Sequence, residues 1–275
     1  MSKKMRLYFA VVMSAVILVF AYWNFGRAPR IVHNFNQDWE FHLGDIGAGD
    51  FASLEFEKIS MPHEFTKNDV GVYRKEFDVS ASWEGRSVVL DFSKHSGNVD
   101  FWINGAKANP NMSGGAGFEI ELSPYLRYGE VNAIAMRLGK DAKVKTSAGI
   151  DGPVSLVVKN KLSIVRNGIN ISVSNEENLS KIFARVRIIN KLTTREVVSV
   201  HFKLKDSQGN NVAERELKTG IDGGALAMLS LEMKVENPII STNQTPKHYY
   251  TLQVSITKGQ KVLDELSSKF EITKK

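Results

Sequence analysis

The sequence predicts an all-β protein built from two β-sandwich domains, and three observations support this fold class. From Arg30 onward, apolar residues recur at alternate positions in short runs, as they do in half-buried strands. Gly, Asn, Asp and Pro separate the runs, and no stretch keeps helical spacing for three turns. A polar stretch, Lys159-Asn160-Lys161, divides two trains of such runs. We therefore predict one sandwich over residues 30–158 and a second over residues 162–275.

The amino terminus predicts a targeting segment over residues 1–26. Lys3, Lys4 and Arg6 precede an uncharged run over residues 7–25, which as a helix would span about 28 Å, the thickness of one hydrocarbon core. The basic cluster favours a cytoplasmic amino terminus, so the β domains would be exported to the periplasm or the cell exterior on a membrane anchor. A cleaved signal peptide is the alternative, because Val19-Phe20-Ala21 suits a signal peptidase, and the protein would then be secreted.

Composition excludes several classes of function. The net charge of +6 in 275 residues owes half of its value to Lys3, Lys4 and Arg6, so it gives no reason to expect a nucleic-acid partner. No cysteine is present, which excludes disulfides and zinc–thiolate sites. The six histidines lack paired spacing. We therefore predict neither a metal site nor a cofactor.

In the first domain, three segments show one-sided alternation. The dipeptide Asn104-Gly105 after the second segment is typical of a tight hairpin. The buried positions predicted for the three segments are Val88, Leu90 and Phe92 (alternating with Ser87 and Asp91), Phe101 and Ile103, and Ile134, Met136 and Leu138.

The second domain reads as seven strands, a number typical of immunoglobulin-like sandwiches. The predicted strands are residues 169–174, 182–190, 197–205, 212–217, 226–235, 249–257 and 262–272. The predicted inward-facing residues are Ile182, Ala184, Val186, Ile188, Val198, Val200, Phe202, Leu204, Leu229, Leu231, Met233, Val235, Tyr250, Leu252, Val254 and Ile256.

A series of ordered motifs resembles the non-catalytic front of family-2 glycoside hydrolases such as β-galactosidases. The first domain resembles their sugar-binding, galactose-binding-like jelly roll, and the second resembles the immunoglobulin-like domain that follows it. The motifs of the first domain are Phe35-Asn36-Gln37-Asp38-Trp39-Glu40-Phe41, Met61-Pro62-His63-Glu64, Tyr73-Arg74-Lys75-Glu76-Phe77, Val99-Asp100-Phe101-Trp102-Ile103-Asn104-Gly105, Gly114-Gly115 with Phe118, and Gly129-Glu130-Val131-Asn132. Those of the second are Val235-Glu236-Asn237-Pro238, Thr245-Pro246 and Tyr250-Thr251-Leu252.

The resemblance implies a chain without the family's catalytic domain. In the family a TIM barrel with two catalytic glutamates comes next, whereas here the sequence ends shortly after Ile272. Asn175-Glu176-Glu177 is expected in a polar turn and not in an active site. The residues with which the family's front domains meet the barrel are replaced by Asp151-Gly152 and Ile239-Ile240. We therefore predict no catalytic residues.

Candidate ligand-binding residues follow from the chemistry of sugars, whose apolar faces stack on aromatic rings while their hydroxyls need polar partners. Trp83 is expected to be exposed, whereas Trp39 and Trp102 lie in strand patterns and are expected in the core. The polar candidates are His63, Asn104 and Asp151. For His63, the alternative is a structural role in which the side chain holds its loop against the sandwich.

These observations lead us to expect a non-catalytic protein of the cell envelope that binds a carbohydrate or an envelope protein. One alternative is an accessory subunit or truncated remnant of a β-galactosidase-like glycoside hydrolase, with the barrel on another chain. Another is a structural module that binds only envelope proteins.

Overall fold

The computed structural model describes residues 28–44, 55–66, 70–109, 117–139, 147–176, 178–241 and 248–273. These residues form an all-β structure in which the only helical element is a 3-10 turn, Ala81–Trp83. The predicted anchor or signal segment, residues 1–26, lies outside the described residues, as do Gly114-Gly115 and Thr245-Pro246. Within the described ranges, no helix is long and apolar enough to cross a membrane.

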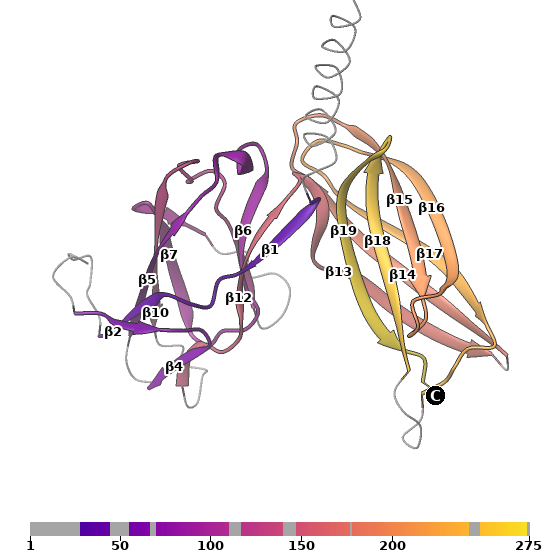
Figure 1. Cartoon of the computed structure of the whole chain (residues 1–275), viewed down its shortest axis with the longest axis horizontal. Coiled ribbons are helices and arrows are strands. Elements are labelled where there is room, and N and C mark those ends of the chain that lie inside the picture. Colours follow the sequence, from indigo (N-terminus) through magenta and orange to yellow (C-terminus); the bar gives the residue numbers. More distant parts are fainter. Residues whose placement is uncertain are drawn as a thin grey trace, which may run out of the picture. The chain divides into compact units, whose positions relative to one another are not determined.

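The chain divides into two compact units, residues 31–161 and residues 162–275, with Arg30 grouped with the second (Figure 1). The strands of the first unit are β1 (Arg30–Asn34), β2 (Trp39–Leu43), β3 (Glu57–Ile59), β4 (His63–Thr66), β5 (Gly71–Asp78), β6 (Ser87–Phe92), β7 (Asn98–Ile103), β8 (Ala106–Ala108), β9 (Phe118–Glu121), β10 (Val131–Gly139), β11 (Ser147–Ile150) and β12 (Val154–Lys159). Those of the second are β13 (Leu162–Glu176), β14 (Leu179–Asn190), β15 (Glu196–Lys205), β16 (Asn211–Ile221), β17 (Leu226–Glu236), β18 (Tyr249–Lys258) and β19 (Lys261–Glu271).

The first unit consists of two larger sheets and a small one. A four-stranded sheet has the order β1-β12-β6-β9, a six-stranded sheet has the order β3-β2-β5-β10-β7-β8, and β11 pairs with β4. All eight predicted inward residues of this unit are buried in one core with the aromatic side chains of β2 and β5. Trp39 is fully buried, as predicted, and its indole N–H donates to the Phe35 carbonyl over 2.8 Å. The two larger sheets therefore enclose a single aromatic-rich core.

One outward position of the first unit departs from the simple alternation. Ser87 was predicted to face outward, yet only 1% of it is exposed. Its hydroxyl donates to the Glu121 carboxylate on the neighbouring strand β9 over 2.9 Å. The buried hydroxyl is satisfied by this charge-assisted hydrogen bond.

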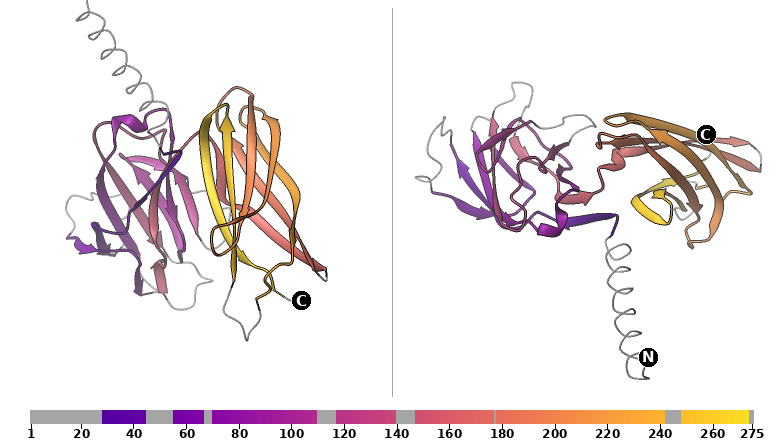
Figure 2. Two further views of the ribbon diagram at one scale, coloured as in Figure 1. Left: turned by 45° about the vertical axis from the view of Figure 1, so that its right-hand side comes forward. Right: turned by 90° about the horizontal axis from the view of Figure 1, so that it is seen from above.

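The second unit contains all seven predicted strands, and six of them are longer than the alternation indicated. β13, β14 and β17 form one sheet, and β16, β15, β18 and β19 form the other. These strands, salmon to yellow in Figure 2, lie side by side as long ribbons. The predicted inward residues all belong to one core, with Leu229 and Leu231 partly buried against it. Asn175 and Glu176 lie at the end of β13 and not in the predicted turn, because β13 pairs with β14 through Glu176–Leu179; Glu177 lies outside the described residues.

A buried ion pair stabilises one end of the second unit. Asp264 is fully buried, and both of its carboxylate oxygens accept hydrogen bonds from the Arg30 guanidinium, at 3.0 and 2.6 Å. The same carboxylate accepts the Ile164 backbone N–H at 2.8 Å, and Arg30 donates to the Ile164 carbonyl over 2.8 Å. These bonds satisfy both charges of a pair whose isolated members would be costly to bury.

Candidate functional site

The side of the six-stranded sheet that faces away from the core, hereafter the outer face, gathers charged side chains from every strand. The register aligns one residue of each strand in a single row. This row consists of Lys58, Glu40, Arg74, Ala135, Trp102 and Lys107, in the order of the strands. Because strands far apart in the sequence supply these residues, the row exists only in the folded sheet.

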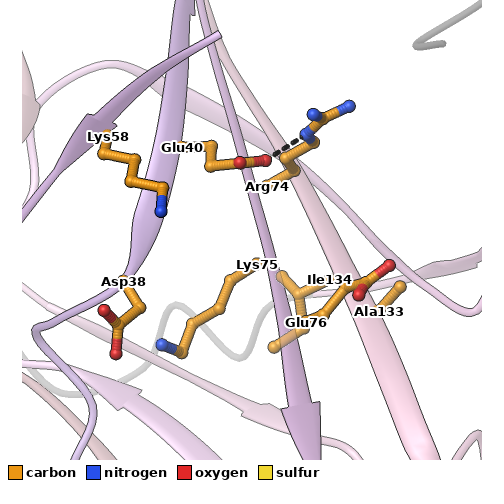
Figure 3. A pocket seen from close by; sticks show the side chains of 8 residues that line it. All are labelled: Asp38, Glu40, Lys58, Arg74, Lys75, Glu76, Ala133 and Ile134. Atoms are coloured by element: carbon orange, nitrogen blue, oxygen red, sulfur yellow. Dashed lines mark hydrogen bonds and ion pairs between the residues drawn. The ribbon is translucent and has the colours of Figure 1, made fainter.

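A hollow of about 470 Å³ opens on one half of this face (Figure 3). Ala133 and Ile134 of β10 line it together with six charged side chains, which are Asp38, Glu40, Lys58, Arg74, Lys75 and Glu76. Three of the six are carboxylates and three are cations, so the lining is electrically balanced. Such a lining offers both donors and acceptors without a strong preference for a charged ligand.

Arg74, which lines the hollow, is held by two contacts. Its Nε lies 2.5 Å from a carboxylate oxygen of Glu40, and its guanidinium carbon lies 3.9 Å from the centre of the Phe56 ring. An ion pair combined with stacking on an aromatic face restricts the rotamers of a long side chain. The polar groups of the hollow are therefore partly positioned before any ligand arrives.

Lys75 is the most buried charge of the hollow. Its ammonium group donates to the Gln37 carbonyl over 2.5 Å and lies 4.7 Å from the centre of the Phe35 ring. Burial lowers the pKa of Lys75, and the carboxylate of Asp38, toward which the ammonium points in Figure 3, opposes that shift. The Lys75 side chain therefore lines the hollow and also contacts Phe35 of the core.

Trp102 lies on the same outer face and not in the core as the sequence analysis expected. It alternates with the buried Phe101 and Ile103, so its half-buried ring points away from them. The Lys107 ammonium lies 5.8 Å from the ring centre and 2.8 Å from the Asp100 carboxylate, while Arg137 lies 3.7 Å from the same carboxylate. An indole beside Ala135 and flanked by ion-paired side chains suits a flat, hydroxylated ring.

His63 and Tyr73 meet behind this sheet. His63 follows the cis Met61-Pro62 bond at the start of β4, and its Nδ1 lies 3.0 Å from the Tyr73 hydroxyl. Its ring centre lies 4.4 Å from that of Phe41. Burial lowers the pKa of His63, although the Glu57 carboxylate opposes the shift. These contacts favour a neutral imidazole packed against the aromatic core.

Asp151 lies near the same tyrosine. Its carboxylate accepts the Ser96 hydroxyl at 3.1 Å and lies 3.8 Å from the Lys94 ammonium, with only 10% of the side chain exposed. Burial raises the pKa of Tyr73, and the Asp151 carboxylate raises it further. The next residue, Gly152, leaves little room for a side chain, since an added Cβ would lie 2.3 Å from the Ser93 hydroxyl oxygen. The fold thus brings His63 and Asp151 to one tyrosine although 88 positions separate them.

The Asn104 side chain bonds its hairpin to residues 125–133, the segment that leads into β10. Asn104 and Gly105 have φ values of 49° and 81°, the left-handed conformations that this turn needs. The amide nitrogen of Asn104 donates to the Tyr125 carbonyl over 2.9 Å and to the Asn132 side chain over 2.8 Å, and its oxygen accepts the Ala133 N–H at 3.0 Å. Ligand binding by Asn104 would compete with these three bonds.

Trp83 is half-buried, whereas the sequence analysis expected it to be exposed. It ends the 3-10 turn and packs against the core of the first unit. Its ring centre lies 5.4 Å from that of His33, at an angle of 37° between the planes. Trp83 and Trp102 are thus two half-buried rings in different surroundings. In the part of the chain that the structure describes, no ring contact or hydrogen bond joins either of them to His63 or Asp151.

Neither the charged hollow nor the outward position of Trp102 was predicted from the sequence. For Trp102 the signal was present, because it alternates with Phe101 and Ile103, which were correctly predicted to be buried. For the hollow no local signal existed, since the pairing of Lys58, Glu40 and Arg74 depends on the register of three strands. Among the described residues, no group of three His, Asp or Glu side chains is arranged to hold a metal ion.

Comparisons with known proteins agree with the fold and with the motifs. Over 267 residues, 88% of this chain, the sequence is 24% identical to the β-galactosidase BoGH2A of Bacteroides ovatus. The chain matches the N-terminal, non-barrel part of family-2 glycoside hydrolases. It spans about a third of the length of such relatives, 31% in the case of BoGH2A. No family model matches the sequence.

Solved structures show the same relationship at the level of the fold. A family-2 β-glucuronidase superposes with a TM-score of 0.78 at 22% identity, covering 90% of this chain and 31% of that protein. A putative β-galactosidase from Bacteroides fragilis superposes with a TM-score of 0.79 at 20% identity, covering 89% of this chain and 41% of that protein. The described residues of our chain are all β and form no (β/α)8 barrel.

Proposed function

We propose that this chain is a non-catalytic carbohydrate-binding protein of the cell envelope, and that its ligand is a neutral saccharide on the outer face of the six-stranded sheet. The observation that carries the proposal is the combination of the half-buried Trp102 with a balanced set of ion-paired side chains on one face. In this proposal the first unit is a galactose-binding-like jelly roll and the second an immunoglobulin-like sandwich. Residues 7–25 would anchor both units to the membrane on its exported side, or be removed as part of a signal peptide.

The chemistry of the outer face supports a neutral ligand more than a charged one. Two of the three cations of the row form ion pairs with carboxylates, in the pairs Arg74–Glu40 and Lys107–Asp100. A charged ligand would have to displace one of these partners, whereas sugar hydroxyls can accept from the cations and donate to the carboxylates while the pairs remain. The indole supplies the apolar surface that a pyranose face needs.

The proposal is tested by saccharide binding to the full-length chain in detergent micelles. A glycan array identifies the ligand, and calorimetry compares the wild type with Trp102→Ala and Trp83→Ala. We expect Trp102→Ala to weaken binding at least tenfold and Trp83→Ala to change it little, because only Trp102 lies on the charged outer face. A silent array, or equal binding by wild type and Trp102→Ala, would remove the proposed site. If Trp83→Ala weakens saccharide binding more than Trp102→Ala does, the sugar binds at Trp83, the tryptophan that the sequence favoured.

A second candidate is an accessory subunit or remnant of a β-galactosidase-like glycoside hydrolase, which the names of the matching relatives favour. The isolated chain should hydrolyse no aryl galactoside or glucuronide in either case. Stimulation of a barrel-containing hydrolase by the added chain would support the subunit. Turnover by the chain alone would overturn both proposals, and binding of envelope proteins without any saccharide would favour the structural module.

A further inference from the structure

The three-stranded sheet of the second unit has its own solvent-facing side, hereafter the Phe183 face. On β14 the residues between the buried Ile182, Ala184 and Val186 point outward, and Phe183 is one of them, with 41% of its surface exposed. The register places Ser172 of β13 and Glu232 of β17 on either side of Phe183. Small or polar neighbours thus leave part of the phenyl ring exposed to solvent.

Arg185 lies two residues along the same strand and on the same side. Asn170 and Ser230 are its neighbours across the sheet. The Arg185 side chain is exposed, and its guanidinium has no hydrogen-bond or ion-pair partner among the described residues. It differs in this respect from Lys181, which pairs with Glu176, and from Arg187, which donates to the carbonyls of Arg166 and Asn167.

These side chains line a hollow of about 430 Å³. Asn170, Ser172 and Ser230 provide amide and hydroxyl groups. Phe183 provides an apolar ring, and Arg185 provides the guanidinium described above. We propose that the Phe183 face binds a carboxylate-bearing saccharide, with the sugar ring on Phe183 and its carboxylate on Arg185. A guanidinium matches the planar geometry of a carboxylate and binds it through two parallel hydrogen bonds.

The surrounding charges give the ligand an orientation. Glu232 lies beside Phe183 and repels a carboxylate, while Arg187 lies two residues beyond Arg185, away from Glu232. The acid group therefore points toward Arg185 and Arg187, and the sugar hydroxyls face Ser172 and Glu232. This site lies wholly in the second unit and does not depend on the neutral-saccharide site proposed for the first.

The test uses the full-length chain, trigalacturonic acid and the fully methyl-esterified form of the same trisaccharide, which keeps the rings and removes the charges. We expect the acid to bind at least tenfold more tightly than the ester at low salt, and the preference to shrink as salt is added. Arg185→Gln should abolish the preference, while Phe183→Ser should weaken both ligands. Arg215→Gln is the matched control and should change neither affinity; this arginine is exposed, and among the described residues it bonds only to the neighbouring Glu214 carbonyl.

Several outcomes would overturn the inference. The first is that trigalacturonic acid does not bind at millimolar concentration. The second is that the acid and the ester bind with equal affinity. The third is that Arg215→Gln weakens binding of the acid as much as Arg185→Gln does. A glutamate octapeptide that binds more tightly than the trisaccharide would assign the face to acidic peptides instead. Trp102→Ala distinguishes this site from the one proposed on the first unit. We expect this variant to lose binding of the neutral saccharide and to bind trigalacturonic acid as the wild type does. If Trp102→Ala loses binding of the acid and Arg185→Gln does not, the acid binds to the first unit.

Discussion

The two units are filled by different kinds of side chain. Nine aromatic residues are buried in the core of the first unit, whereas Phe202 and Tyr250 are the aromatic ones among the buried core residues described for the second. The first unit has short strands of three to nine residues, and the second has strands of ten to fifteen. Long regular strands let aliphatic side chains interdigitate in even layers, while short strands leave irregular space that large rings fill.

This contrast bears on where each unit can carry a site. In the first unit the core aromatics also brace the polar groups, as Phe35 does for Lys75 and Phe41 for His63. In the second unit the core is separate from the Phe183 face, whose side chains come from the outward positions of regular strands. Changes to the first unit's core should therefore disturb its site, and changes to the second unit's core should not.

The largest effect is expected from breaking the buried ion pair of the second unit. Asp264→Ala leaves the Arg30 guanidinium and the Ile164 N–H without their partner, which should lower the free energy of unfolding by about 3–5 kcal/mol. Asp222→Ala, which removes the exposed partner of Arg195, is the control and should have little effect. Denaturant unfolding followed by far-UV circular dichroism measures both. Equal stability of the two variants would contradict the role of the buried pair.

The next effect tests the aromatic core of the first unit. Phe92 is fully buried and stacks on Phe118 with ring centres 4.4 Å apart, so Phe92→Leu should destabilise the unit by about 2 kcal/mol. Ile188→Val, a smaller deletion of a single carbon in the aliphatic core, should cost about 1 kcal/mol. In a Trp23→Phe background, the fluorescence of Trp39, Trp83 and Trp102 follows the first unit, because all three lie within residues 31–161. Far-UV circular dichroism, to which the long strands of the second unit contribute, follows Ile188→Val. A larger loss in Ile188→Val would contradict the comparison.

A smaller effect is expected at the Asn104-Gly105 hairpin. Asn104→Ala removes three side-chain hydrogen bonds and places alanine at a positive φ, which together should cost about 1–2 kcal/mol. Asn104→Gly also removes the bonds but relieves the backbone, so it should cost less. Saccharide binding measured on both variants also tests the sequence-based role of Asn104. Weakened binding with unchanged stability would favour a direct contact.

The smallest effect concerns pH. Burial lowers the pKa of His63 below its usual value of 6.5, so the unfolded chain binds the proton more readily than the folded one. The stability of the first unit should therefore fall as the pH drops below about 6.5 and rise as the pH is raised through that window. His63→Gln should remove this part of the pH dependence. An unchanged slope in the variant would show that other groups cause it.

Much of the fold could be predicted from the sequence, and most reliably in the second unit. The alternation of Val198, Val200, Phe202 and Leu204 identified both the strand and its buried side, because such a pattern needs only local information. The same alternation identifies Phe101 and Ile103 as buried and places Trp102, between them, on the opposite side of the strand. The ends of the strands were less predictable, since β13 extends to Glu176 through its pairing with β14.

The candidate sites were less predictable than the fold. His63 and Asp151 were chosen from separate motifs, and nothing in either motif indicates that Tyr73 lies near both. Trp83 looked exposed because it stands beside Glu84 and Gly85, yet His33 and the core cover part of it. Contacts of this kind come from residues far away in the chain, which local patterns do not describe.

By itself, the sequence determined the all-β class, the seven strands of the second unit, the Asn104-Gly105 turn and the likeness to family-2 glycoside hydrolases. Only the tertiary structure decided that Lys58, Glu40 and Arg74 form one row, that Trp102 joins them, and that Phe183 and Arg185 share an uncovered face. The physical reason is that the alternation of apolar and polar residues along a strand indicates only which side of that strand is buried. The neighbours across a sheet depend on register, which long-range packing sets.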